Sequence, residues 1–173
     1  MIKAWLLVGL FNLKKMEEQH LEFMREAIAL SDYNVQNGLG GPFGAVIVKD
    51  GKIIAKSANK VTTTNDPTAH AEVATIRLAC QALQTFTLEG CVIYTSCEPC
   101  PMCLGAIYWA RLDKMYYANT KSDAAAIGFD DQFIYEEIDL KLEERKLKSE
   151  QILKEEALLV FEQWKASRQK IDY

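Results

Sequence analysis

The sequence predicts one α/β domain, and three observations support this prediction. The chain has 173 residues, a length that suits a single domain with one hydrophobic core. Apolar residues make up 49% and charged residues 25% of the chain, which is typical of a globular protein. Short apolar runs of strand length alternate with longer segments of helical periodicity, which is the pattern of a layered α/β fold.

The first elements expected are a helix and a hairpin. Apolar residues recur at helical spacing over residues 17–37, and the glycine-rich residues 38–41 end this helix. Two β-rich runs follow and are joined by Asp50-Gly51, a dipeptide that favours a tight hairpin turn. An Asp-Pro-Thr sequence then introduces a second helix over about residues 69–84.

The second half of the chain continues the alternation of strands and helices. Pro99 and Pro101 bracket Cys100, which places this cysteine in the first turn of a third helix that reaches about Arg111. The remaining elements expected are a strand over residues 91–95, a strand over 115–119, short helices over 123–128 and 129–138, a charged irregular stretch over 139–150, and a last helix over 154–170.

Charge and cysteine content exclude some function classes. The formal net charge is −4 and the basic residues are scattered, so we expect neither a nucleic-acid partner nor a membrane partner. The five cysteines are odd in number and three lie close together in sequence, which does not suit a disulfide framework. We expect thiols in a reducing compartment, the cytoplasm, with some of them bound to a metal.

Residues 1–15 are expected to form an N-terminal extension to a single domain over residues 16–173. Their apolar stretch is far shorter than the roughly 20 residues of a membrane span, and no small-residue cleavage site follows it. Met16 opens a helix-like pattern and is a candidate start. The alternative is that residues 1–15 pack as an extra strand or helix turn.

Two sequence motifs predict a zinc site. His70 stands two residues before Glu72 at the start of the second expected helix, and Cys100 and Cys103 form a P-C-x-x-C motif at the start of the third. Zinc takes histidine nitrogen and cysteine thiolate in tetrahedral geometry, and a catalytic site uses three protein ligands and a water molecule. A helix N-terminus lowers the pKa of a cysteine and so favours the thiolate. Glu72 would then remain free to move a proton.

A third cysteine, Cys97, leaves the ligand set to be decided. Cys100 and Cys103 are three residues apart and share one helix face, whereas Cys97 precedes the helix in a turn. We therefore expect His70, Cys100 and Cys103 to bind the metal and Cys97 to be a buried thiol beside them. The alternative is a closed, purely structural zinc site of His70 and all three cysteines, which leaves Glu72 without a role.

These motifs resemble those of the zinc-dependent nucleobase deaminases, and most closely those of bacterial guanine deaminases. The segments GGPFGAVIVKDG, TNDPTAHAEV, YTSCEPCPMCLGAIYWAR and GFDDQFIYEEI carry the resemblance, together with a C-terminal tyrosine. It covers the chain from about residue 20 onward. It implies a three-layer α/β/α cytidine-deaminase-like fold with a central mixed sheet of about five strands flanked by helices.

The resemblance also implies a reaction and a set of site residues. The reaction would be hydrolytic deamination of free guanine to xanthine and ammonia, with Zn²⁺ as cofactor, Glu72 as proton shuttle and Asp131 near the exocyclic amine. The protein would be a homodimer that exchanges its C-terminal segment. Substrate contacts would come from Asn59, the backbone of Ala71, Phe43, Trp109, and Tyr173 of the neighbouring subunit.

Other interpretations of the same residues remain open. The zinc chemistry also suits guanosine, cytosine, cytidine or tRNA adenosine, although the scattered basic residues disfavour tRNA. A non-catalytic zinc-binding module is a further alternative. For single residues the alternatives are a turn residue at Asn59, a helix cap at Asp131, core packing at Phe43 and Trp109, and a frayed terminus at Tyr173.

Overall fold

The computed structural model describes residues 2–172, with side chains described from Met16 onward. The chain divides after Asp131 into two compact units, which are considered separately. The prediction of a single domain over residues 16–173 with a separate extension over residues 1–15 stays a prediction.

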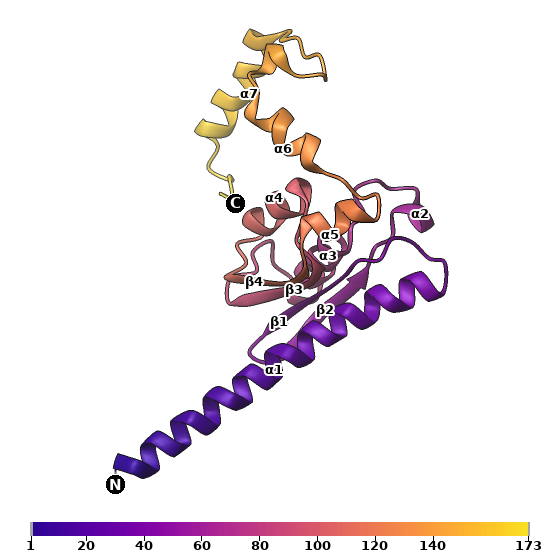
Figure 1. The fold of residues 1–173 in the computed structure, drawn as a ribbon. Helices are drawn as coiled ribbons and strands as arrows, with labels where there is room; N and C mark the ends of the chain where they lie inside the picture. The colour runs from indigo at the N-terminus through magenta and orange to yellow at the C-terminus, as the bar shows by residue number, and fades with distance from the viewer. Residues whose placement is uncertain (1, 173) are drawn as a thin grey trace. The chain divides into compact units, whose positions relative to one another are not determined.

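A mixed four-stranded sheet forms the centre of the first unit (Figure 1). β1 pairs antiparallel with both β2 and β3, and β3 pairs parallel with β4, in the order β2-β1-β3-β4. The sheet is mixed as predicted but has four strands rather than about five. The strands are β1 (Gly44–Lys49), β2 (Lys52–Ala58), β3 (Cys91–Cys97) and β4 (Lys114–Asn119).

The turn between β1 and β2 forms where the sequence predicts it. Asp50 and Gly51 have φ angles of 51° and 71°, and positive φ at both positions is what a tight type I′ hairpin turn requires. Side chains along β1 and β3 point alternately to the two faces of the sheet. Val46 and Tyr94 pack on one face, and Ile47 and Ile93 pack on the other.

Helices cover both faces of the sheet, which gives the three-layer arrangement that was expected (Figure 1). α1 (Ile2–Gln36) packs against the face that carries Val46 and Tyr94. α3 (Ala71–Leu83) and α4 (Pro101–Trp109) cover the opposite face, where Ala79 and Ile107 join the larger core cluster. The smaller helices of this unit are α2 (Val61–Thr64) and α5 (Lys121–Ala126).

Several helix boundaries differ from the predicted ones. α1 begins well before residue 17, and α2 was not predicted because its four residues are too few to show a helical period. Cys100 is the N-cap of α4 and Pro101 occupies its first turn, so the prediction that Cys100 lies inside that turn was wrong by one position. Proline is favoured at the first helical position because its missing N–H would have no helical partner there.

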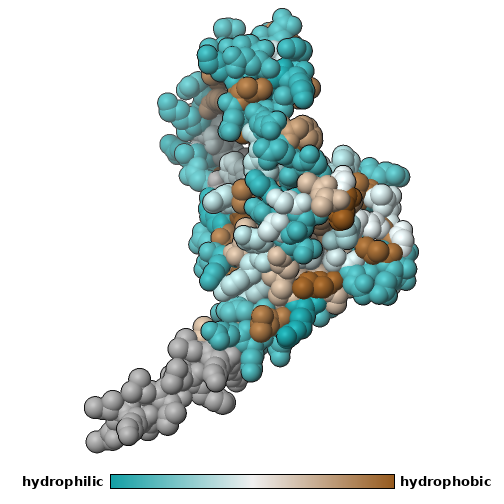
Figure 2. Space-filling model, in the orientation of Figure 1, coloured by the Kyte–Doolittle hydropathy of each residue, from teal (hydrophilic) through white to brown (hydrophobic). Residues whose placement is uncertain are grey.

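The second unit contains three short helical elements: α6 (Gln132–Asp139), η1 (Leu142–Glu144) and α7 (Lys154–Ala166). None of the residues 132–172 is buried, although many of them are apolar. Figure 2 shows apolar side chains among polar ones on the visible face of this unit. In the part of the chain that the structure describes, no helix is long and apolar enough to cross a membrane.

Candidate metal centre and active site

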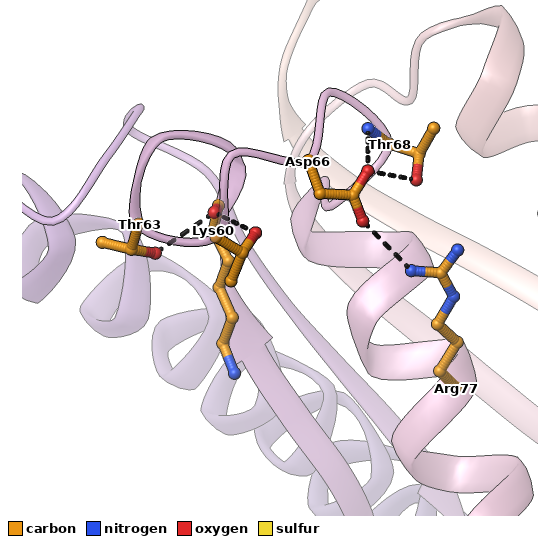
Figure 3. A network of polar contacts seen from close by, with 6 residues as sticks. Lys60, Thr63, Asp66, Thr68 and Arg77 are labelled. Atoms are coloured by element: carbon orange, nitrogen blue, oxygen red, sulfur yellow. Dashed lines mark hydrogen bonds and ion pairs between the residues drawn. The ribbon is translucent and has the colours of Figure 1, made fainter.

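A short loop before α3 contains Asp66 and Thr68 and is held by polar contacts (Figure 3). The Asp66 carboxylate accepts hydrogen bonds from the backbone nitrogen and hydroxyl of Thr68 at 2.8 and 2.7 Å, and these bonds lower the pKa of Asp66. Arg77 on α3 lies 3.7 Å from the same carboxylate. The loop is thus tied to the helix that it precedes, and His70 is the N-cap residue of that helix.

The two ligand cysteines lie after the end of β3, at the start of α4. Cys100 caps α4, and Cys103 lies in its first turn and is fully buried. The Nδ1 atom of His70 lies 3.5 Å from the sulfur of Cys100 and 3.5 Å from the sulfur of Cys103. The three donor atoms lie within 4.8 Å of one another. Two helix N-termini therefore converge on one point, as the sequence predicts.

The spacing of these donors fits tetrahedral zinc. A zinc ion about 2.3 Å from sulfur and about 2.0 Å from nitrogen places a sulfur and a nitrogen ligand about 3.5 Å apart. Both sulfur–nitrogen distances in the site have this value. The group also has three donors, which leaves one position of a tetrahedron for water, as in catalytic rather than structural zinc sites.

The two ligand thiols differ in pKa, and one of them is already set up to bind a cation as a thiolate. A hydrogen bond from the Cys103 thiol, with a further one to His70, lowers the pKa of Cys100 to about 4. The same pairing, together with burial, raises the pKa of Cys103. The hydrogen bond to Cys100 also raises the pKa of His70. A divalent cation would displace the thiol proton of Cys103, because metal ligands bind in their deprotonated form.

Glu72 lies in the first turn of α3, beside the donor group, and is only 6% exposed. Its Oε2 accepts a hydrogen bond of 3.5 Å from the Cys103 thiol. Burial raises the pKa of Glu72, which brings a carboxyl group closer to the range in which it can both take and give a proton. Glu72 lies outside the group of three metal donors, as a proton shuttle requires.

Cys97 occupies a different position from the two ligand cysteines. Its thiol donates to the backbone oxygen of Thr120 at 3.5 Å, and burial raises its pKa to about 11. Among the described residues the metal-donor group consists of His70, Cys100 and Cys103. Cys97 is therefore a protonated thiol beside the site in this geometry, as the sequence favoured.

A cavity of about 440 Å³ opens beside the donor group, within the size range of small-molecule sites. Its floor includes His70, Cys100 and Glu72, and its walls include Phe43, Asn59 and Asp131 among other residues. Burial, followed by the charge of the Cys100 thiolate, raises the pKa of Asp131. The cavity thus combines carboxyl groups, aromatic rings and an amide with two of the zinc donors, His70 and Cys100.

Residues 17–119 match the family described as the cytidine and deoxycytidylate deaminase zinc-binding region. The chain belongs to this family. A guanine deaminase of Bacillus subtilis (strain 168) is 54% identical over 154 residues, which cover 89% of this chain and 99% of that protein. An X-ray structure of guanine deaminase from Bacillus subtilis matches with a TM-score of 0.87 at 55% identity, over 89% of this chain and 98% of that one.

More distant members of this zinc deaminase family are similar over a shorter part of the chain. A tRNA-specific adenosine deaminase of Agrobacterium fabrum is 46% identical over 86 residues, which cover 50% of this chain and 57% of that protein. A structure of guanine deaminase from Nitrosomonas europaea matches with a TM-score of 0.60 at 34% identity, over 63% of each chain. The 154 residues similar to the Bacillus subtilis enzyme outnumber the 131 residues of the first unit, so the similarity extends into the C-terminal unit.

The remaining predicted site residues of this deaminase-family chain lie in different places. Ala71 is fully buried as the first residue of α3, between His70 and Glu72. Trp109 ends α4, is 68% exposed and is not among the residues that line the cavity. Tyr173 lies outside the described residues. The roles of Ala71, Trp109 and Tyr173 stay predictions.

Sequence reasoning missed part of the cavity wall. Phe129 packs edge-on against Phe43, with ring centroids 4.9 Å apart and an angle of 88° between the planes. Glu98 accepts a hydrogen bond of 3.0 Å from the backbone nitrogen of Lys121, and both residues line the cavity. Glu98 and Lys121 lie just beyond the ends of the parallel strands β3 and β4, and Phe129 belongs to the GFDDQFIYEEI segment. These positions are a signal that could have identified the three residues.

Proposed function

We propose that the chain hydrolyses free guanine to xanthine and ammonia in a zinc-dependent reaction. The observation that carries this proposal is that one cavity is lined by two members of the zinc-donor group, His70 and Cys100, by buried Glu72, and by Asp131, Phe43 and Asn59. The 54% identity to a guanine deaminase over 89% of the chain supports guanine as the base.

The base would be held by the walls of the cavity. Phe43 would stack on the purine, and Phe129 packs edge-on against the ring of Phe43. The Oδ1 of Asn59 accepts a hydrogen bond from the backbone nitrogen of Val61 at 3.2 Å, so its amide nitrogen remains to donate to a purine oxygen. The backbone of Ala71, at the N-terminus of α3, would supply a further hydrogen bond.

The reaction forms a bond between water oxygen and C2 of guanine and breaks the bond from C2 to the exocyclic nitrogen. Zinc held by His70, Cys100 and Cys103 would act as a Lewis acid that lowers the pKa of water. Glu72 would take a proton from the attacking water and pass it to a ring nitrogen. As the bond from C2 to the exocyclic nitrogen breaks, Asp131 would take the second proton of the former water from the C2 oxygen and give one to the departing nitrogen, so that ammonia leaves and the C2 carbonyl of xanthine forms.

The proposal includes a homodimer in which the C-terminal segments are exchanged and Tyr173 of one chain reaches the site of the other, while Trp109 helps to wall the pocket. Large apolar side chains of the second unit are exposed, among them Leu147 at 79% and Phe161 at 70%. In the first unit, Tyr108 and Trp109 at the end of α4 are exposed too. Monomeric proteins rarely leave so much apolar surface in water, and a second copy would cover it. The free cysteines suit a reducing compartment such as the cytoplasm.

The test is ammonia release from guanine by zinc-loaded protein, with guanosine, cytosine and adenine measured in parallel. We expect release from guanine, no comparable release from the other three, and loss of release after zinc is chelated. Preferential release from guanosine would mean that the cavity accommodates a ribose and that the proposed substrate is wrong. Zinc binding without release from any of the four would favour a non-catalytic zinc module.

A further inference from the structure

One buried amide outside the cavity joins the two segments that carry the base-binding side chains. Asn34 lies in the last turn of α1, is 3% exposed and does not line the cavity. Its amide nitrogen donates one hydrogen bond to the backbone oxygen of Gly41 at 2.8 Å and another to the backbone oxygen of Asn59 at 3.0 Å. Both hydrogen atoms of the amide group are therefore in use.

These two hydrogen bonds belong to a closed circuit. The backbone nitrogen of Phe43 donates to the same Gly41 oxygen at 2.8 Å, and the backbone nitrogen of Asn59 donates to the Phe43 oxygen at 2.9 Å. The circuit thus runs from Asn34 through Gly41 and Phe43 to Asn59 and back to Asn34. Gly41, Phe43 and Asn59 all line the cavity, and Phe43 and Asn59 carry the proposed side-chain contacts to the base.

The packing around the circuit leaves little room for it to shift. A Cβ atom added to Gly40 would lie 3.0 Å from the backbone oxygen of Asn59 and 3.1 Å from the amide nitrogen of Asn34. Gly40 also has a positive φ angle of 157°, which residues with a side chain rarely adopt. The chain therefore passes closely over the Asn34 amide, which lies between the loop and the end of β2.

We propose that Asn34 is a positioning residue that sets the distance between Phe43 and Asn59 for binding of the base. This inference rests on the proposed function of the cavity. An amide supplies two donors to two carbonyl oxygens, whereas a carboxylate of the same shape supplies none and repels both. Asn34→Asp therefore loosens the circuit without altering the zinc donors or Glu72.

The test is a double-mutant cycle in KM with Asn59→Ala. Loss of donors to buried carbonyl oxygens is expected to raise KM for the base about tenfold in Asn34→Asp, with a smaller change in kcat and unchanged zinc content. Because Asn34 acts largely through Asn59, the further rise in KM in the Asn59→Ala background is expected to be only about twofold. Asn34→Ser, which keeps one donor and adds no charge, is the second variant and is expected to give an intermediate KM.

Tyr94→Phe is the control for a general loss of stability. The Tyr94 hydroxyl contacts His20 at 2.5 Å on the face of the sheet that α1 covers, and Tyr94 does not line the cavity. This variant is expected to lower Tm and leave KM unchanged. The proposal is overturned if Asn34→Asp leaves KM unchanged, if its effect is fully retained in the Asn59→Ala background, or if Tyr94→Phe raises KM equally.

The cycle is measured on whichever of guanine, guanosine, cytosine and adenine the wild type deaminates fastest, so a wrong substrate assignment does not affect it. A crystal structure of Asn34→Asp gives a readout that needs no turnover. We expect a longer separation between residue 34 and the Asn59 oxygen and a displaced Asn59 side chain. An unmoved Asn59 would contradict the inference whatever the substrate is.

Discussion

Glu72 is the residue that we propose to act in catalysis without binding the metal. It lies beside the three donor atoms without belonging to them, and burial raises its pKa. We predict that Glu72→Gln keeps the zinc and loses about 10²–10⁴-fold in turnover, because general acid–base transfer contributes on that scale. Zinc analysis and ammonia release on the same preparation check this. Turnover close to the wild-type rate would remove Glu72 from the mechanism.

The three neighbouring cysteines are predicted to differ in their effect on zinc content. Cys100→Ser and Cys103→Ser each remove a thiolate donor, so the purified variants should contain far less zinc than the wild type. Cys97→Ser should keep its zinc, because the Cys97 thiol faces the backbone oxygen of Thr120. Metal analysis of the three variants after identical chelator treatment is the measurement. A metal-free Cys97→Ser would restore the closed site of four ligands as the better description.

The residues of the site differ in how visible they are in the sequence. His70, Cys100 and Cys103 could be predicted because two motifs at helix starts, H-x-E and P-C-x-x-C, carry them in a few consecutive letters. Asn34 could not be predicted in this way. Its contacts are 7 and 25 residues away in sequence, and their existence depends on how α1 ends against β2.

Gly44 lies in the contact between α1 and β1, where the fold leaves no room for a side chain. A Cβ atom on Gly44 would lie 2.2 Å from the backbone oxygen of Ala27 and 2.9 Å from the Cβ of Leu30. Gly44→Ala must push α1 away from the sheet, since the blocking atom is backbone. We predict a loss of about 3 kcal/mol in the free energy of unfolding and a Tm lower by roughly 6–12 °C, measured by thermal denaturation.

Gly38→Ala is the matched control for this substitution. Gly38 has a φ angle of 62° but no neighbouring atom within 4 Å of an added Cβ, so it tests backbone strain without a clash. It should cost about 1 kcal/mol. If the two variants lose equal stability, the close approach of α1 to β1 is not the reason why residue 44 must be glycine.

Elements with a strong period or a specific turn dipeptide were the most predictable. The hairpin at Asp50-Gly51 and the helix at α3 follow from such signals. α2 has too few residues for a period, and the capping position of Cys100 depends on where the chain leaves β3. The sequence pattern identifies four runs of strand character, and the sheet has these four strands, whereas the family resemblance implied about five.

At the scale of the whole molecule, the exposed apolar residues of the C-terminal unit point to a partner copy. Leu147 is 79% exposed, Phe161 is 70% exposed and Trp164 is 49% exposed. No residue from 132 to 172 is buried. Such a segment buries too little surface to fold stably by itself. We therefore expect light scattering to give the mass of a dimer. A monomer at micromolar concentration would remove the exchange from the proposal.

Exchange of the C-terminal segment makes a sharper prediction than dimer formation alone. In an exchanged dimer, a chain with Glu72→Gln and a chain that lacks Tyr173 are each inactive as homodimers. In the mixed dimer, the chain without Tyr173 offers an intact Glu72, and the other chain offers Tyr173 to the same site. Co-expression of the two chains should therefore restore about a quarter of wild-type ammonia release, since about half of the dimers are mixed and each has one complete site.

The same experiment distinguishes exchange from an unexchanged dimer. If each chain kept its C-terminal segment on its own site, both chains of a mixed dimer would remain defective and activity would stay at the level of the two homodimers. If the chain without Tyr173 is fully active by itself, the terminal tyrosine has no part in the site. Refolding the two purified chains together should reproduce the co-expression result, because exchanged segments can be redistributed only when the subunits separate.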